Sequence, residues 1–172
     1  MTGFVEVLVG LLDFFKRRPS PGGEEGDDPD PAFSRELDDL INQLRNLASA
    51  QSRGFTAERI GARGSKAARA IPHLLYVLQN DPGADARTGA AGALGDVGIA
   101  SQEVVDALVR AVRHDVDDVR LNAIISLGQL GPTADVALPL LESIAASPSE
   151  SSEIRFRAGI SAKILKQESG LR

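Results

Sequence analysis

The chain has 172 residues, a length that suits one domain with appendages. Its formal net charge of −5 disfavours general attraction to nucleic acid, and the lack of cysteine excludes disulfides and thiolate metal sites. Apolar residues make up 42% of the chain but aromatic residues only 4%. We therefore expect a core of Ala, Leu, Val and Ile between closely spaced helices.

Residues 3–18 are predicted to form an amphipathic helix. Small and charged side chains recur at spacings of three and four residues and share one narrow face: Gly3, Glu6, Gly10, Asp13 and Arg17. The remaining arc is apolar and must be covered by something, so these side chains are candidate partner contacts: Phe4, Leu8, Leu11 and Phe15. Three roles remain open for this helix. It docks on a protein partner, lies on a membrane surface, or folds back as a cap on the rest of the chain.

The charges around this helix bear on localisation. Lys16-Arg17-Arg18 follows the apolar stretch, which is the reverse of the polarity of a secretory signal. The stretch is also too short to span a bilayer. We expect a cytoplasmic protein, with peripheral attachment to a membrane or a complex as a further possibility.

Residues 19–33 are predicted to be a linker. They hold four Pro, three Gly and five acidic residues without a base, a composition that prevents regular structure and keeps the segment solvated. The expected organisation is therefore a helix at 1–18, a linker at 19–33, a repeat domain at 34–168 and a tail at 169–172.

The repeat domain is expected to begin with a helix capped by Ser34 and carrying Leu37, Leu40 and Leu44 on its apolar face. A loop is expected near Gly54, followed by a short helix over residues 56–63.

A period of 33 to 35 residues becomes visible from residue 64 onward. Each unit starts with a glycine that we expect to end a helix: Gly64, Gly98 and Gly131. Seven residues after each glycine an apolar stripe begins, at Ile71, Val105 and Leu138. Pro72 and Pro139 fall in the first turn of these helices, where a missing N–H costs little. A second helix follows in each unit. Two helices per period indicate an all-α chain, a short right-handed α-solenoid of three to four repeats.

The repeated pattern resembles the short HEAT-like repeats found in phycobilin-lyase-type proteins and many bacterial scaffolds. The resemblance spans about residues 56–166 and is carried by Gly64, Ala70, Ile71, Pro72, Leu74, Asp85, Arg87, Ala90, Leu94, Gly95 and Gly98. It implies the solenoid fold, but such repeats serve lyases, adaptors and scaffolds alike. Lys163 replaces the glycine of Gly95 and Gly128, which indicates a C-terminal cap.

An acid–x–Arg motif opens each second helix: Asp85 with Arg87, Asp118 with Arg120, and Glu153 with Arg155. We expect these residues to form a structural ladder of charge-assisted hydrogen bonds between neighbouring repeats. A motif that recurs once in every repeat is expected of residues that stack the repeats. A catalytic site would need the motif only once in the chain.

The second-helix positions opposite the core are expected to line a concave surface. Its candidate partner-binding residues are Asn122, Ile125, Gln129, Arg157 and Ile160. The same face is expected to include Gly89, Ala93, Ser126, Ser161 and Ile164. The alternative is that the helical wheel is rotated and that the isoleucines belong to the core.

Other candidate sites are weaker. Residues 45–69 carry a basic cluster, which is either an anion site or a solvated face, and no aromatic side chains interleave to stack on bases. His73 and His114 stand alone, so no metal site is expected. No phosphate loop or nucleophile motif is present in the sequence. We expect neither a cofactor nor nucleic-acid binding.

The sequence thus favours a non-enzymatic protein-binding adaptor, scaffold or assembly subunit. It would use the concave face and the N-terminal helix. The family resemblance leaves open a lyase-like or chaperone-like accessory that acts on a tetrapyrrole-bearing or other protein client. A peripheral scaffold attached to a membrane through residues 3–18 is the third hypothesis.

Overall fold

The computed structural model describes residues 31–170, apart from the side chain of Ser169. Over this range the chain is all-α, with no strand, and consists of helix pairs joined by short loops. The prediction of an α-helical repeat solenoid is confirmed. Residues 1–30 lie outside the described part, and with them the predicted N-terminal helix.

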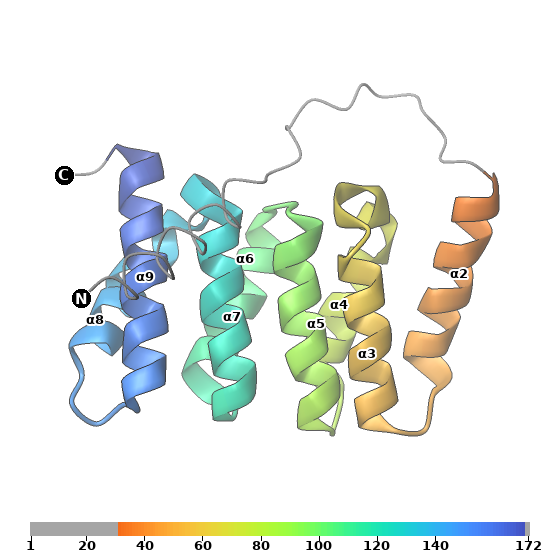
Figure 1. Cartoon of the computed structure of the whole chain (residues 1–172), viewed down its shortest axis with the longest axis horizontal. Coiled ribbons are helices and arrows are strands. Elements are labelled where there is room, and N and C mark those ends of the chain that lie inside the picture. Colours follow the sequence, from red (N-terminus) through yellow and green to blue (C-terminus); the bar gives the residue numbers. More distant parts are fainter. Residues whose placement is uncertain (1–30, 171–172) are drawn as a thin grey trace, which may run out of the picture.

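Four helix pairs make up the described part of the chain. They are α2 (Pro31–Asn46) with α3 (Ala50–Gly61), α4 (Ile71–Asn80) with α5 (Ala84–Val97), α6 (Gln102–His114) with α7 (Asp117–Leu130), and α8 (Leu138–Ala146) with α9 (Ser152–Ser169). Two 3-10 helices, η1 (Gly64–Ala70) and η2 (Gly131–Ala137), lead into α4 and α8. In Figure 1, α3, α5, α7 and α9 stand side by side in one row, and α4, α6 and α8 lie behind it.

Glycine and proline end and start the helices where the repeat predicts. Gly98 and Gly131 follow α5 and α7 with φ of 71° and 65°, a left-handed backbone that glycine adopts without strain. Pro72 and Pro139 lie in the first turn of α4 and α8. These boundaries therefore follow from local backbone chemistry.

The first repeat differs from its prediction. Helix α2 begins at Pro31, so Ser34 lies inside the helix and does not cap it. Helix α3 begins at Ala50, where the Ser49 hydroxyl accepts a hydrogen bond from the Ser52 N–H at 3.4 Å. Gly54 is therefore inside a helix, and not in a loop. A Cβ at this position would lie 2.5 Å from the Asp85 carbonyl oxygen of α5, so this glycine permits close helix packing.

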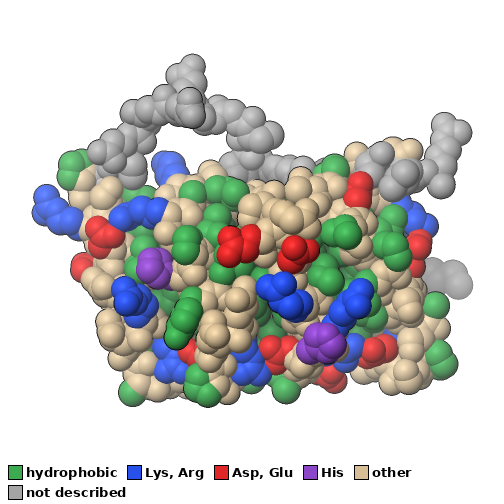
Figure 2. Space-filling view, turned by 180° about the vertical axis from the view of Figure 1, so that it is seen from behind, with side chains coloured by type: hydrophobic (Ala, Val, Ile, Leu, Met, Phe, Trp, Pro, Cys, Tyr) green, Lys and Arg blue, Asp and Glu red, His purple; other side chains and the backbone are tan. Residues whose placement is uncertain are grey.

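Small residues bring the second helices together. The α3–α5, α5–α7 and α7–α9 pairs are in extensive contact, whereas the first helices of successive repeats touch little. The α3-α5-α7-α9 side is therefore the concave one. Between the two rows lies the core, whose largest fully buried side chains include Leu74, Leu94, Leu108, Leu127 and Leu165. On the opposite face, formed by α4, α6 and α8, acidic and basic side chains are interspersed (Figure 2).

Candidate protein-binding surfaces

A ladder of arginines ties each repeat to the next. The Arg53 guanidinium donates from Nε and Nη2 to both oxygens of Asp81, at 2.6 and 2.7 Å. Arg87 donates to Asp115 in the same bidentate way, at 2.8 and 2.6 Å. Each arginine also donates from Nη1 to two carbonyls of the loop before its own helix. One guanidinium therefore fixes its own loop and the loop of the following repeat.

The third rung has the same role with different geometry. Arg120 donates from Nη2 to Glu150 at 2.6 Å and from Nη1 to Asp117 at 2.9 Å. Its Nε donates to the Val112 carbonyl oxygen at 3.0 Å. The longer glutamate side chain thus keeps the connection to the following repeat with a single hydrogen bond.

Burial and pairing oppose each other in the ladder carboxylates. Burial alone would raise the pKa of Asp81, but hydrogen bonds from Arg53 and from the Gly83 N–H outweigh it and lower the pKa. The same balance lowers the pKa of Asp115, where Arg87 and the Val116 N–H are the donors. Both aspartates are therefore held in the charged form.

The ladder uses acids other than those expected from the acid–x–Arg motif. Arg87 and Arg120 are ladder residues, but Asp85, Asp118 and Glu153 are exposed in the first turns of their helices. The acids in the ladder are the loop residues Asp81, Asp115 and Glu150. Geometry explains the difference, because the loop projects toward the preceding repeat. Residues two apart on a helix point about 200° apart and do not meet.

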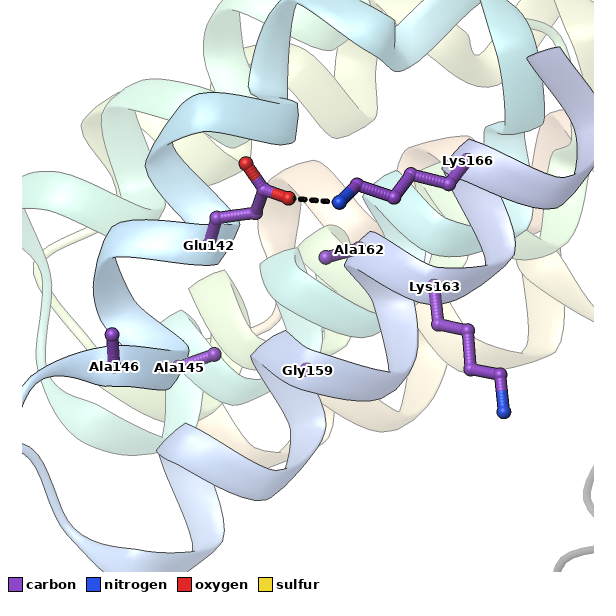
Figure 3. A pocket seen from close by; sticks show the side chains of 7 residues that line it. All are labelled: Glu142, Ala145, Ala146, Gly159, Ala162, Lys163 and Lys166. Atoms are coloured by element: carbon purple, nitrogen blue, oxygen red, sulfur yellow. Dashed lines mark ion pairs between the residues drawn. The ribbon is translucent and has the colours of Figure 1, made fainter. Parts of the chain in front are cut away.

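Arg155 occupies the ladder position of the last helix pair and forms no ion pair with an acid among residues 31–170. Its Nε is shielded from solvent and has no hydrogen-bond partner among the described residues. From Gly159 onward, one helical turn after Arg155, α8 and α9 line an open groove of about 470 Å³. Figure 3 shows Ala145, Gly159 and Ala162 along this groove, with Lys166 reaching across to Glu142 and Lys163 pointing away. We call this region, Arg155 together with the α8–α9 groove, the end face.

The concave face carries the sequence-predicted partner residues in half-buried positions. On α7 these are Asn122, Ile125 and Gln129, and on α9 they are Arg157 and Ile160. Gln129 donates a hydrogen bond to Asp96 of α5 at 3.2 Å. Desolvation raises the pKa of Asp96, and this hydrogen bond opposes the shift.

The other residues expected on this face are buried between repeats. Ser126 and Ser161 are 0% and 2% exposed, and Ile164 is 7% exposed. The Ser126 hydroxyl donates to the Ala91 carbonyl oxygen of the preceding repeat at 2.8 Å. Gly89 and Ala93 are likewise buried. The expected surface is therefore narrower than predicted, because part of it is the interface with the preceding repeat.

Half of the six basic side chains in the cluster of the first repeat form ion pairs within the fold. Arg63 pairs with Glu36 and Arg69 with Asp38, both on α2, in addition to the Arg53 pair. A groove of about 820 Å³ lies near this cluster and is lined by Arg45, His73, Tyr76, Asn80 and Pro82 among others. Over residues 31–170, no group of three His, Asp or Glu side chains is arranged to hold a metal ion.

These features define a class of protein, a short α-solenoid whose stacked helix pairs present a continuous curved surface. A comparison with known protein families identifies the kind of repeat. HEAT repeats match residues 71–163, more than half of the chain, so the protein belongs to the HEAT-repeat family. No match is found among curated proteins. The predicted partner residues Phe4, Leu8, Leu11 and Phe15 lie outside the described residues.

Proposed function

We propose that the protein is a non-enzymatic adaptor or assembly subunit that binds a protein partner on its concave face. The observation that carries the proposal is the strip of Ile125 and Ile160, which neighbouring helices cover only in part. Polar side chains of Asn122 and Arg157 lie beside this strip on α7 and α9. Apolar side chains with a polar rim are typical of protein-binding surfaces, and HEAT repeats generally mediate protein–protein contacts.

The charges along the concave face indicate the chemistry of the partner. Asp85, Asp118 and Glu153 are exposed, one in the first turn of each of three successive second helices. They form an acidic edge beside the apolar strip. A segment with apolar side chains on one side and Lys or Arg on the next would match both features. Residues 3–18 would supply a second binding element on the same partner.

Substitution of the strip tests this function. We expect Ile125→Glu with Ile160→Glu to abolish retention of partner proteins by the tagged full chain in extracts of its native cells. The matched control is Val136→Glu on η2, because Val136 is 64% exposed and lies away from the strip. Circular dichroism should show folded protein in both cases. Equal retention by the double variant and the wild type would contradict the proposal.

The two alternatives have separate tests. A lyase-like or chaperone-like role rests on the resemblance to phycobilin-lyase-type repeats, and a spectral change of free bilin on mixing with the protein would support it. Attachment to a membrane through residues 3–18 requires that the full chain sediments with anionic vesicles. Neither result is expected of an adaptor that binds only protein.

A further inference from the structure

The end face lacks the carboxylate that every other described rung contains. Arg53, Arg87 and Arg120 each donate to an acid in the loop of the following repeat, 28 or 30 residues later. For Arg155 that acid would come from a unit stacked on α8 and α9. Among the described residues, the extensive contacts of α9 are with α7, η2 and α8.

The unpaired atom of Arg155 is one that has an acceptor in the other three rungs. In Arg53 and Arg87 the Nε donates to one oxygen of the following repeat's aspartate, at 2.6 and 2.8 Å. In Arg120 the Nε donates to the Val112 carbonyl oxygen, and Nη2 donates to Glu150. In Arg155 the same Nε is shielded from water and unpaired. Leaving a charged donor without an acceptor destabilises the folded chain. The side chain as a whole is only partly buried, so its guanidinium can still receive a carboxylate from outside.

The shape of the end face selects an extended chain over another packed helix. In the inner repeats, Gly95 and Gly128 let the next helix approach closely. Lys163 holds the equivalent position on α9 and is exposed, and Phe156 nearby is 46% exposed. A helix would meet these two long side chains. An extended acidic segment could instead lie across the end face, with one carboxylate at Arg155 and with the exposed Lys163 two turns further along α9.

We propose that the end face binds the acidic run at residues 24–30 of a second copy of this chain. The run holds Glu24, Glu25, Asp27, Asp28 and Asp30 and no base. Its Asp28-Pro29 stands immediately before α2 with the spacing that Asp81-Pro82 has before α5, three residues from acid to first helical residue. The run thus shares the acid–Pro spacing of one ladder acid, Asp81, whereas Asp115 and Glu150 stand two residues before their helices and have no proline. The site is separate from the concave face, so the proposal does not depend on the adaptor function.

Chain length shows why the run must come from another copy. Helices α2 and α9 stand at opposite ends of the molecule (Figure 1). Four intervals between packed helices separate them, which is about 32–40 Å at 8–10 Å per interval. Seven extended residues before Pro31 span at most about 25 Å. The run cannot reach Arg155 of its own chain, whereas a second copy placed head to tail brings it there.

A symmetric arrangement of two end faces would not satisfy the arginine. Two α9 helices crossing antiparallel at Gly159 would place Arg155 opposite Lys163, so that like charges would face each other. A continuation of the solenoid in register also fails. It would bring the loop at Leu47 to Arg155, and this loop has no acid. Head-to-tail association through the acidic run is the arrangement that supplies a carboxylate.

Sedimentation velocity of the full chain over a wide concentration range tests the proposal. At low salt the average mass should rise with concentration, and added salt should reverse the rise. Arg155→Met should weaken association about tenfold or more, which corresponds to about 1.4 kcal/mol or more. The matched control is Arg110→Met, an exposed arginine of α6 away from the end face, and it should associate as the wild type does.

Further variants identify the acid. Replacing Glu24, Glu25, Asp27 and Asp28 by their amides should abolish association, and a synthetic peptide of residues 19–30 should compete with it. A chain with both Arg155→Glu and Asp28→Arg should associate again. The Arg155 Nε–H signal in NMR spectra should shift with concentration in the wild type and not in the amide variant.

Three results would overturn the proposal. The first is a chain that stays monomeric at all concentrations. The second is association that survives Arg155→Met. The third is association that needs Arg155 but survives neutralisation of the run, because the carboxylate would then come from elsewhere. Arg155→Lys serves as a second variant if the methionine variant fails to fold, and it should also weaken association because lysine cannot form the bidentate pair.

Discussion

Gly89 of α5 offers a test in which the usual effect of a substitution changes sign. Alanine normally stabilises a helix interior by about 1 kcal/mol relative to glycine. Gly89 lies against Gly54 of α3, and a Cβ on it would be 2.7 Å from the Gly54 Cα and 2.8 Å from its carbonyl carbon. These are backbone atoms, so no side-chain rotation can relieve the clash. Gly89→Ala must push α5 away from α3.

The magnitude follows from these two terms. Overpacking of a close-packed interface costs about 1–3 kcal/mol, and a clash with backbone belongs at the upper end of this range. Subtracting the gain of about 1 kcal/mol in helix propensity leaves a net loss of about 2 kcal/mol. For a domain of this size that corresponds to a fall of about 4–8 °C in Tm.

Gly159→Ala is the matched control, because Gly159 also lies inside a helix and has open space beside it. The nearest atom that a Cβ would meet is the Ala145 Cβ at 3.8 Å, an ordinary van der Waals distance. This variant should gain up to about 1 kcal/mol. Urea unfolding followed by circular dichroism measures both. If Gly89→Ala raised the free energy of unfolding as Gly159→Ala does, the inferred helix contact would be refuted.

The ladder and Asp96 give three more predictions. Arg87→Met should lower the free energy of unfolding by about 1–3 kcal/mol, because it leaves the partly buried Asp115 unpaired, and urea unfolding at neutral pH measures the loss. The pKa values of Asp81 and Asp115 are lowered, so their contribution is present above the unfolded-state pKa of about 3.9 and is lost as pH falls through the folded-state pKa. Unfolding measured as a function of pH should therefore show wild-type stability falling below about pH 4, and Asp81→Asn with Asp115→Asn should flatten this dependence. The pKa of Asp96 is raised, so the contribution of this residue to the free energy of unfolding is present below the unfolded-state pKa and is lost as pH rises through the folded-state pKa. Asp96→Asn should therefore have a higher free energy of unfolding than the wild type at neutral pH. Equal values would contradict the desolvation of Asp96.

The solenoid fold could be predicted from the sequence because the residues that define the helix boundaries act locally. Gly98 and Gly131 end helices through their own backbone geometry, and Pro72 and Pro139 start helices through theirs. Gly54 was placed wrongly for the same reason. A glycine inside a helix looks like a break until the helix that packs against it is known, and for Gly54 that helix is α5.

The ladder acids were missed because their spacing to the arginine is irregular. Asp81 stands six residues before Arg87, whereas Asp115 and Glu150 stand five before Arg120 and Arg155. The more regular acid–x–Arg pairs were therefore the stronger sequence pattern. Each arginine binds the acid of the following repeat, so the informative spacing is 28 to 30 residues forward, and not two residues back.

The width of the exposed concave face could not be predicted from the sequence either. A helical wheel shows which residues share a side of a helix, but the stacking between repeats decides which side is covered. Ser126 and Ile125 are adjacent in sequence, yet one is buried against α5 and the other is half-exposed. Only the packed structure distinguishes them.

The ladder also has a direction, and this bears on how such an array can lengthen. Each inner repeat brings an acid for the arginine before it and an arginine for the acid after it, as Asp81 with Arg87 and Asp115 with Arg120 illustrate. Duplication of one whole unit inside the array would therefore create a complete new rung and break none. Loss of part of a unit would leave an arginine or an acid of the ladder without its partner. Growth and shrinkage by whole periods of 33 to 35 residues are thus favoured by the same hydrogen bonds that hold the repeats together.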